Sequence, residues 1–206
     1  MTPTPPIVAL APARARAAAA VLALAFQDDP VARHVFPDAV RRAPALRWLF
    51  RVQIRDGLRH GRVDTTTAGD GVALWLAPGN TTLTPWRVLR SGALLAPVRW
   101  GWGACRRAAA FLKTTTAWQH QHAREAHWYL AALGVTPARQ GHGIGTALLQ
   151  PVLARADAAG LPCYLETGVA RNVGFYARQG FIVVDEGALP QGGPWLWAMR
   201  RAPHTP

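Results

Sequence analysis

The chain has few cysteines and no long apolar run. Cys105 and Cys163 are the only cysteines among 206 residues, so we expect neither a disulfide framework nor a zinc site, and we expect the protein to be cytoplasmic. The apolar stretch 17–26 is too short to span a membrane and follows two arginines, as in a signal peptide. Because Gln27-Asp28-Asp29-Pro30 ends it like a helix entering a loop, we interpret it as an amphipathic first helix.

Acidic residues and lysine are also scarce. Eleven acidic residues face 23 basic ones, of which only Lys113 is a lysine, and the formal net charge is +12. Such an excess attracts nucleic acid nonspecifically and equally favours an anionic cofactor. The arginines are scattered along the chain, and zinc-finger, RRM and helix-turn-helix patterns are missing. We therefore expect no specific nucleic-acid partner and no membrane partner.

Length and periodicity favour one α/β domain. Half of the residues are hydrophobic, enough for one substantial core. We predict a disordered tail at 1–6 and a single domain at 7–202. Its first elements are a strand at 7–10, helices at 13–27 and 39–58, and a hairpin of strands at 62–67 and 71–77.

A glycine-rich turn divides two apolar segments in the second half of the chain. The run Leu130–Val135 is typical of a buried strand, and apolar residues at helical spacing follow Gly145. Glycines at 141, 143 and 145 leave the backbone N–H groups of such a turn open at a helix N-terminus, where the helix dipole attracts anions. The pattern predicts a phosphate-binding loop.

Two common phosphate loops use glycines at a similar spacing. A P-loop requires a lysine and a hydroxyl pair, and Thr146 follows Gly145 with no lysine near it. A Rossmann turn requires an acidic residue about 20 positions on, which Glu166 satisfies by spacing. The glycine turn lies two thirds of the way along the chain. This position argues against a Rossmann unit, because such a unit usually opens a domain.

Two further patterns occur in a fixed order around that loop. Gln140-x-x-Gly143-x-Gly145 is followed by a strand at 161–167 and then by Asn172-x-x-Phe175-Tyr176-x-x-x-Gly180-Phe181. Together they resemble the acyl-CoA signature and the second fingerprint of the GNAT superfamily of N-acetyltransferases. The stretch 127–199 is most similar to the puromycin-type branch of that superfamily, including Pro151 inside the helix and Leu165-Glu166-Thr167 on the strand.

The resemblance implies a fold and an activity. The fold is α/β, with a central mixed twisted sheet flanked by helices, a helical insertion at 83–123 and an acetyl-CoA-binding core at 127–187. The activity is direct transfer of acetyl from acetyl-CoA to the amine of a small molecule, such as an aminoacyl-type antibiotic, in a ternary complex. No metal is implied, and the protein is expected to be a monomer or homodimer.

The resemblance also assigns the cofactor residues. The strand before the loop splays from its neighbour in this superfamily, and its free backbone groups bind pantetheine. Asn172 is assigned a hydrogen bond to the cofactor, although a helix N-cap would look the same in sequence. The implied cofactor-binding residues are Leu133, Val135, Gln140, Gly141, His142, Gly143, Ile144, Gly145, Thr146 and Asn172.

Acetyl transfer to an amine needs a base and an acid. Tyr176 is the predicted general acid, because a phenol with a pKa near 10 stays protonated at neutral pH and can donate to a thiolate. Glu166, at the end of the strand bordering the splay, is the candidate base. His127, His122, His120 and a water chain are the alternatives.

The insertion and two departures from the puromycin-type enzymes bear on the acceptor. Helices are predicted at 84–95 and 101–121. The insertion contains Trp86, Trp100, Trp102 and Trp118, which either shape an acceptor lid or fill the core. Asp29 stands in place of an aromatic residue and could hold a cationic amine. His142 stands where lysine or arginine is common. A peptide N-terminal acetyltransferase and a noncatalytic CoA-binding module are the other hypotheses.

Overall fold

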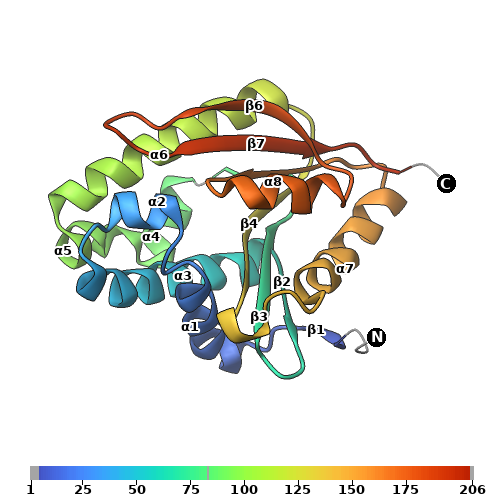
Figure 1. Ribbon diagram of the computed structural model, residues 1–206, viewed down its shortest axis with the longest axis horizontal. Helices are drawn as coiled ribbons and strands as arrows, with labels where there is room; N and C mark the ends of the chain where they lie inside the picture. The colour runs from blue at the N-terminus through green and yellow to red at the C-terminus, as the bar shows by residue number, and fades with distance from the viewer. Residues whose placement is uncertain (1–4, 83, 205–206) are drawn as a thin grey trace.

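Seven strands form one mixed sheet with helices on both of its faces (Figure 1). The computed structural model describes residues 5–82 and 84–204, so most of the predicted tail at 1–6 lies outside the described residues. The strand order is β1-β2-β3-β4-β5-β7-β6. All neighbouring strands are antiparallel except β4 and β5, which are parallel. The predicted α/β class with a central mixed sheet is confirmed.

The first half of the chain supplies three strands and the helices on one face. The β2–β3 hairpin turns at Gly69, whose φ of +75° suits glycine. Asp29 and Asp38 cap the helices that follow them by accepting backbone N–H bonds. The elements are β1 Ile7–Ala9, the 3-10 turn η1 Pro12–Arg14, α1 Ala15–Ala25, α2 Pro30–Val35, α3 Ala39–His60, β2 Gly61–Thr66 and β3 Gly71–Leu76.

The segment between β3 and β4 is helical, as predicted, but broken differently. The first expected helix, 84–95, ends at Ser91 because Gly92 takes a left-handed φ of +85°. Gly101, with φ +78°, separates the next short helix from a long one. The elements are α4 Pro85–Ser91, η2 Ala93–Leu95, α5 Ala96–Trp100 and α6 Trp102–His122.

The last part of the chain completes the sheet. The helix after the glycine loop contains Pro151, as the sequence indicated. Two features were not predicted: the short helix α2 and the β6–β7 hairpin. The elements are β4 Trp128–Val135, η3 Pro137–Arg139, α7 Ile144–Ala158, β5 Cys163–Thr167, α8 Ala170–Ala177, β6 Ile182–Ala188 and β7 Trp195–Arg201.

Alternation along the central strands creates a separate core on each face of the sheet. On β3, Val72 and Leu74 pack with α1, α2 and α3. Ala73 and Trp75, from the same strand, pack with α7 and α8. The sheet therefore separates a face built by the early helices from a face built by the glycine-loop helix. Over the residues that the structure describes, no helix is long and apolar enough to cross a membrane.

Candidate active site

The parallel strands β4 and β5 pair over only three residues and then separate. Their pairing ends at Leu130 with Leu165, although β4 continues to Val135. The edge of β4 that would face β5 is therefore unpaired beyond Leu130. An open strand edge presents backbone N–H and C=O groups to a bound molecule.

A bulge decides which residues of β4 point to this edge. Leu74 pairs with Ala132 and Trp75 with Leu130, so Ala131 is an extra residue on β4. Thr136 donates its N–H to Asp70 on the β3 side, and alternate residues of a strand point their N–H and C=O groups to the same side. Leu133 and Val135, the two predicted pantetheine-binding residues, therefore point their backbone groups into the opening.

The predicted phosphate loop lies directly after this edge. Gly141 and Gly143 have φ values of +81° and +75°, and a Cβ on either would meet no atom within 4 Å, so the loop is open on its outer side. The first helical hydrogen bond of α7 runs from the N–H of Ala147 to the carbonyl of Gly143. The N–H groups of Ile144, Gly145 and Thr146 are thus free of intrahelical acceptors. This cradle fits a pyrophosphate at a helix N-terminus.

Side chains of the loop brace it from within. The Gln140 amide donates from Nε2 to the carbonyl of Val135 at 3.1 Å. His142 Nδ1 lies 2.8 Å from the carbonyl of Gln140. Both side chains are exposed. Gly145 lies against Phe175 of α8, since a Cβ there would come within 3.3 Å of that ring. The loop and α8 are therefore in contact.

The predicted acid, Tyr176, lies on α8 and belongs to the core that α7 and α8 form with the sheet. Tyr176 is buried and packs edge-on against Phe175 and Phe181. Burial raises the pKa of Tyr176, and the nearby charge of Asp29 raises it further. Both causes keep the phenol protonated, which is the state that a general acid needs.

Asn172 lies one turn before Tyr176 on the same helix. Its side-chain amide is 3.5 Å from the Thr167 hydroxyl, at the end of β5. The N-cap of α8 is Val169, so the capping alternative for Asn172 is wrong. Asn172 occupies the third helical position instead, where its side chain lies between α8 and the end of β5.

Glu166 reaches the opening from the other face of the sheet. It shares a strand face with Tyr164, which packs with Trp118 of α6, whereas Leu165 packs with α7 and α8. Tyr129 on β4 donates its hydroxyl to the Glu166 carboxylate at 2.8 Å. Burial raises the pKa of Glu166 to about 7, against the lowering effect of its tyrosine neighbours.

Tyr129 and Tyr164 were not predicted from the sequence as neighbours of Glu166. The parallel register aligns Tyr129 with Tyr164, so Glu166 lies two residues further along the same face. The alternation Tyr-x-Glu on β5 and the tyrosine on β4 were visible in the sequence. The register that brings them together was not.

Asp29 is the N-cap of α2. Its carboxylate accepts N–H bonds from Val31 and Ala32 at 2.8 and 3.1 Å. Burial raises the pKa of Asp29, although these two bonds lower it. The negative charge of Asp29 raises the pKa of Tyr176, so Asp29 lies near the predicted acid. An ionised carboxylate here places negative charge near Tyr176.

The three histidines considered as alternative bases are engaged or distant. Both ring nitrogens of His127 have partners, the Glu125 carbonyl at 2.8 Å and the Gln119 amide at 3.1 Å. His122 lies 2.7 Å from Asp185, and His120 is exposed at the end of α6. Glu166 is the first residue of β5 beyond its pairing with β4, and burial raises its pKa toward neutrality.

The four tryptophans of the insertion do not act together. Trp118 packs beside Tyr164, and Trp100 packs edge-on against Phe36 and Trp48. Trp86 and Trp102 are 61% and 80% exposed, so for these two the core-filling interpretation is wrong. The α6 helix packs against α2, β6 and β7, whereas α4 packs against α3. α6 therefore lies beside α2, the helix that Asp29 caps.

A strand splay beside a glycine loop and a helix N-terminus is the arrangement expected of an acetyltransferase of the acyl-CoA-binding type. The model of the acetyltransferase (GNAT) family matches residues 75–181, and the chain belongs to this family. An uncharacterized N-acetyltransferase of Schizosaccharomyces pombe is 33% identical over 116 residues. That match covers 54% of this chain and 47% of the yeast protein, so the chain spans about half the length of its curated relative.

Solved structures share the whole fold. A Corynebacterium glutamicum protein described as "histone acetyltransferase HPA2 and related acetyltransferase" superposes with a TM-score of 0.73 at 26% identity, covering 99% of both chains. Arylalkylamine N-acetyltransferase 2 of Aedes aegypti gives a TM-score of 0.62 at 14% identity, covering 97% of this chain and 99% of the other. The second likeness concerns the fold alone.

Proposed function

We propose that the protein is an acetyl-CoA-dependent N-acetyltransferase that acetylates the amine of a small molecule by direct transfer in a ternary complex. The observation that carries the proposal is the open edge of β4 at Leu133 and Val135, continuous with the cradle at the start of α7. Family membership supports acetyl-CoA as the donor. An aminoacyl-type antibiotic is one of the acceptors to test.

The donor would be held mainly by backbone groups. The strand edge would pair with the pantetheine amides, and the open glycine loop would bind the pyrophosphate through N–H groups. The residues proposed to bind it are Leu133, Val135, Gln140, Gly141, His142, Gly143, Ile144, Gly145, Thr146 and Asn172.

The proposed chemistry divides between the two faces of the sheet. The amine nitrogen attacks the thioester carbonyl and forms the amide bond, while the C–S bond breaks. Glu166, half ionised near pH 7, takes the proton that the amine loses. Tyr176 donates its phenolic proton to the departing thiolate. No hydrogen bond joins Glu166 to Tyr176 in the described part of the chain. Their positions on opposite faces of the sheet suit one residue to act as base and the other as acid.

Asp29 favours an acceptor that carries a second positive charge. Its carboxylate lies by the acid on the acceptor side, and an ionised carboxylate attracts a cation at short range. Exchange of Asp29 for Asn preserves helix capping, since both residues are good N-caps. The expected effect of Asp29→Asn is a rise in KM of about tenfold for a diamine, with little change for a matched monoamine.

The test is release of free CoA thiol from acetyl-CoA across a panel of amines. The panel holds puromycin, aminoglycosides, polyamines, amino acids and short peptides. Turnover with a small amine supports the proposal, and turnover with peptides alone would replace it with the peptide N-terminal alternative. CoA binding without any turnover would favour the noncatalytic module.

Tyr176→Phe tests the acid on whichever acceptor is found. We expect kcat to fall by roughly a hundredfold or more, while acetyl-CoA affinity measured by calorimetry stays within about twofold. Phe181→Leu is the packing control, because it changes a ring that packs against Tyr176 but keeps the phenol; its kcat should fall far less. Unchanged turnover in Tyr176→Phe would exclude Tyr176 as the acid.

A further inference from the structure

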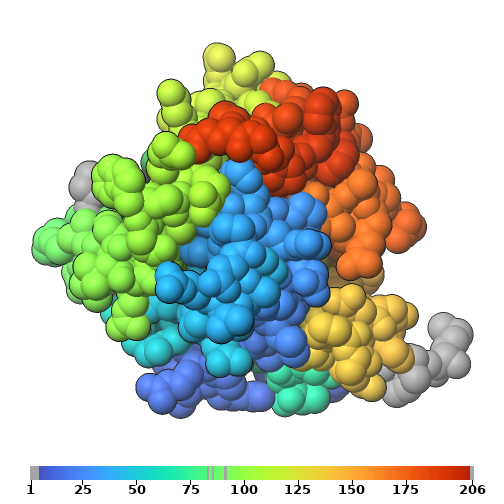
Figure 2. All heavy atoms as spheres, turned by 60° about the vertical axis from the view of Figure 1, so that its left-hand side comes forward, coloured from blue at the N-terminus to red at the C-terminus, as the bar shows by residue number. Residues whose placement is uncertain are grey.

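Exposed apolar side chains concentrate on the short helices after β3. Of the 13 large hydrophobic side chains that are exposed in the described structure, six fall between residues 86 and 102. Val98 and Trp102 are 87% and 80% exposed, and η2 and α5 bury none of their own residues. The segment forms the green flank at the left of Figure 2. This apolar face consists of Trp86, Leu89, Leu94, Leu95, Val98 and Trp102.

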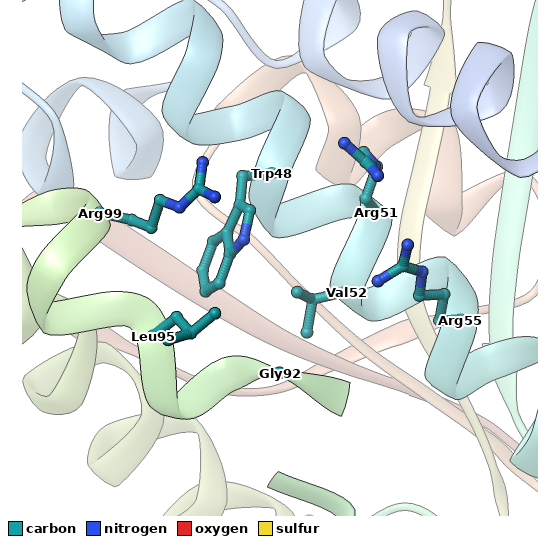
Figure 3. Close-up of a pocket in the computed structure, with 7 residues that line it drawn as sticks. All are labelled: Trp48, Arg51, Val52, Arg55, Gly92, Leu95 and Arg99. Carbon is teal, nitrogen blue, oxygen red and sulfur yellow. The ribbon is translucent and has the colours of Figure 1, made fainter. Parts of the chain in front are cut away.

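Arginines adjoin the apolar face. Leu95 and Arg99 lie four residues apart, on one side of their helical segment. Together with Trp48, Arg51 and Arg55 of α3 they line a hollow of about 200 Å³ (Figure 3). Figure 3 shows the guanidinium groups of both segments around this hollow. Leu95 of the apolar face thus lines the same hollow as the basic side chains of α3 and Arg99.

The basic side chains continue along α3. Arg47, Arg51, Arg55 and Arg59 recur at four-residue spacing, which places like charges side by side on the helix. A second hollow, of about 600 Å³, shares Arg51 and Arg55 with the first and extends to Arg59. Within the described ranges none of these four arginines has an acidic partner. Because their positive charges repel one another, an anionic ligand between them would be favoured. We call them, with Arg99, the arginine strip.

The neighbouring sequence supplies no negative charge. No aspartate or glutamate occurs between Asp70 and Glu125. On α3, Asp56 is occupied by a buried ion pair with Arg87. Arg90 lies 5.6 Å from the centre of the Trp86 ring, so the apolar face carries cations as well.

A partner must match both the positive charge of the arginine strip and the exposed side chains of the apolar face. A second copy of this chain would set arginine against arginine across a two-fold interface. A nucleic acid would pair with the strip but leave Leu94, Val98 and Trp102 in water. An anionic lipid surface satisfies both parts, because phosphates bind the guanidiniums while tryptophan and leucine enter the boundary between headgroups and acyl chains.

We propose that the apolar face and the arginine strip bind peripherally to anionic membrane surfaces. This departs from the sequence expectation of no membrane partner. It is independent of the acetyltransferase activity, because it uses none of the residues assigned to the active site. The surface would hold the protein on the membrane without any segment crossing it.

Vesicle co-sedimentation of the full chain tests the proposal without acetyl-CoA. Vesicles of phosphatidylcholine alone are compared with vesicles containing about one third phosphatidylserine. We expect binding only to the anionic vesicles, weakening as salt rises from about 0.1 M to about 0.5 M. Equal binding to both vesicles, or binding to neither, would overturn the proposal.

Two variants separate the charge from the apolar contribution. Arg51→Gln/Arg55→Gln/Arg99→Gln should lower the partition coefficient on the order of a hundredfold. Leu94→Gln/Val98→Gln/Trp102→Gln should lower it about tenfold or more and leave residual binding that salt abolishes. Either triple variant binding like wild type would contradict the proposal.

The controls lie on other parts of the surface. Arg155→Gln/Ile182→Thr removes one exposed arginine and one exposed apolar side chain elsewhere, and should bind like wild type. Thermal unfolding checks each fold, and Val98→Gln alone serves as a milder probe if the apolar triple variant unfolds. If sedimentation equilibrium showed that the apolar variants convert a dimer to a monomer, the face would be a contact between copies and the membrane proposal would fail.

Discussion

Burial of the Glu166 carboxyl should make the free energy of unfolding depend on pH. The substitution Glu166→Gln should remove this contribution. The pKa of Glu166 rises from 4.5 to about 7 on folding, a change of about 2.5. Each pKa unit corresponds to about 1.4 kcal/mol, so the folded state holds this proton more tightly by about 3 kcal/mol. This contribution is fully present below pH 4.5, the unfolded value, and is lost as the pH rises through about 7.

Glu166→Gln replaces the carboxyl with a group that does not titrate. We expect the free energy of unfolding of the variant, relative to wild type, to rise by about 3 kcal/mol between about pH 4.5 and pH 8. That corresponds to roughly 6–12 °C in Tm for a chain of this size. The gain arises because burying a neutral amide beside the Tyr129 hydroxyl costs less than burying a carboxylate.

Urea unfolding of both proteins across this pH range measures the effect. Other titrating groups are common to the two proteins, so they cancel in the difference. Tyr129→Phe is the matched control: it removes the hydrogen bond that lowers the pKa of Glu166 and should move the pH window upward. A difference that stays within about 1 kcal/mol at all pH values, or that falls as the pH rises, would refute the burial of this carboxyl.

Two other substitutions test the loop and the insertion. Gly143→Val should abolish acetyl-CoA binding in calorimetry, because valine is strained at φ +75°; Gly79→Val, at φ +79° in a turn outside the site, carries the same strain and should still bind. Asp56→Ala should lower the free energy of unfolding in urea by about 3–5 kcal/mol, since it leaves Arg87 buried without its partner. Asp56→Ala/Arg87→Leu should recover much of that loss, and a double variant as unstable as the single one would contradict this explanation.

The strand, glycine turn and helix that are proposed to bind the donor could be predicted well because they are local. The strand β4, the glycine turn and the helix α7 follow one another within residues 128–158, and their geometry depends on residue types that can be recognised singly. Gly141 and Gly143 need positive φ, and the spacing of the apolar residues predicts the elements on either side. The alternating and apolar runs also identified several of the strands and helices of the first half of the chain.

The residues proposed for the acceptor side were less predictable because they come from distant segments. The few residues of α2 give no periodicity, and its start at Asp29 can be recognised only once the cap is seen. The exposure of Trp86 and Trp102 could not be inferred either, since composition predicts buried tryptophan. The bulge at Ala131, which turns Leu133 toward the opening, has no clear signal in a run of small apolar residues.

Acceptor and donor binding should vary independently of each other. In the proposed site, donor contacts would depend on backbone groups of β4 and the glycine loop, so most side-chain changes nearby would leave them in place. Acceptor contacts would depend on the side chains of Asp29, Tyr129 and Glu166, which come from three separate elements. Substitutions at Asp29 should therefore change which amine is preferred and leave acetyl-CoA affinity unchanged. If Asp29→Asn weakened both to the same extent, the two halves would be coupled through α8, and acceptor choice would reside in the packing of Tyr176 instead.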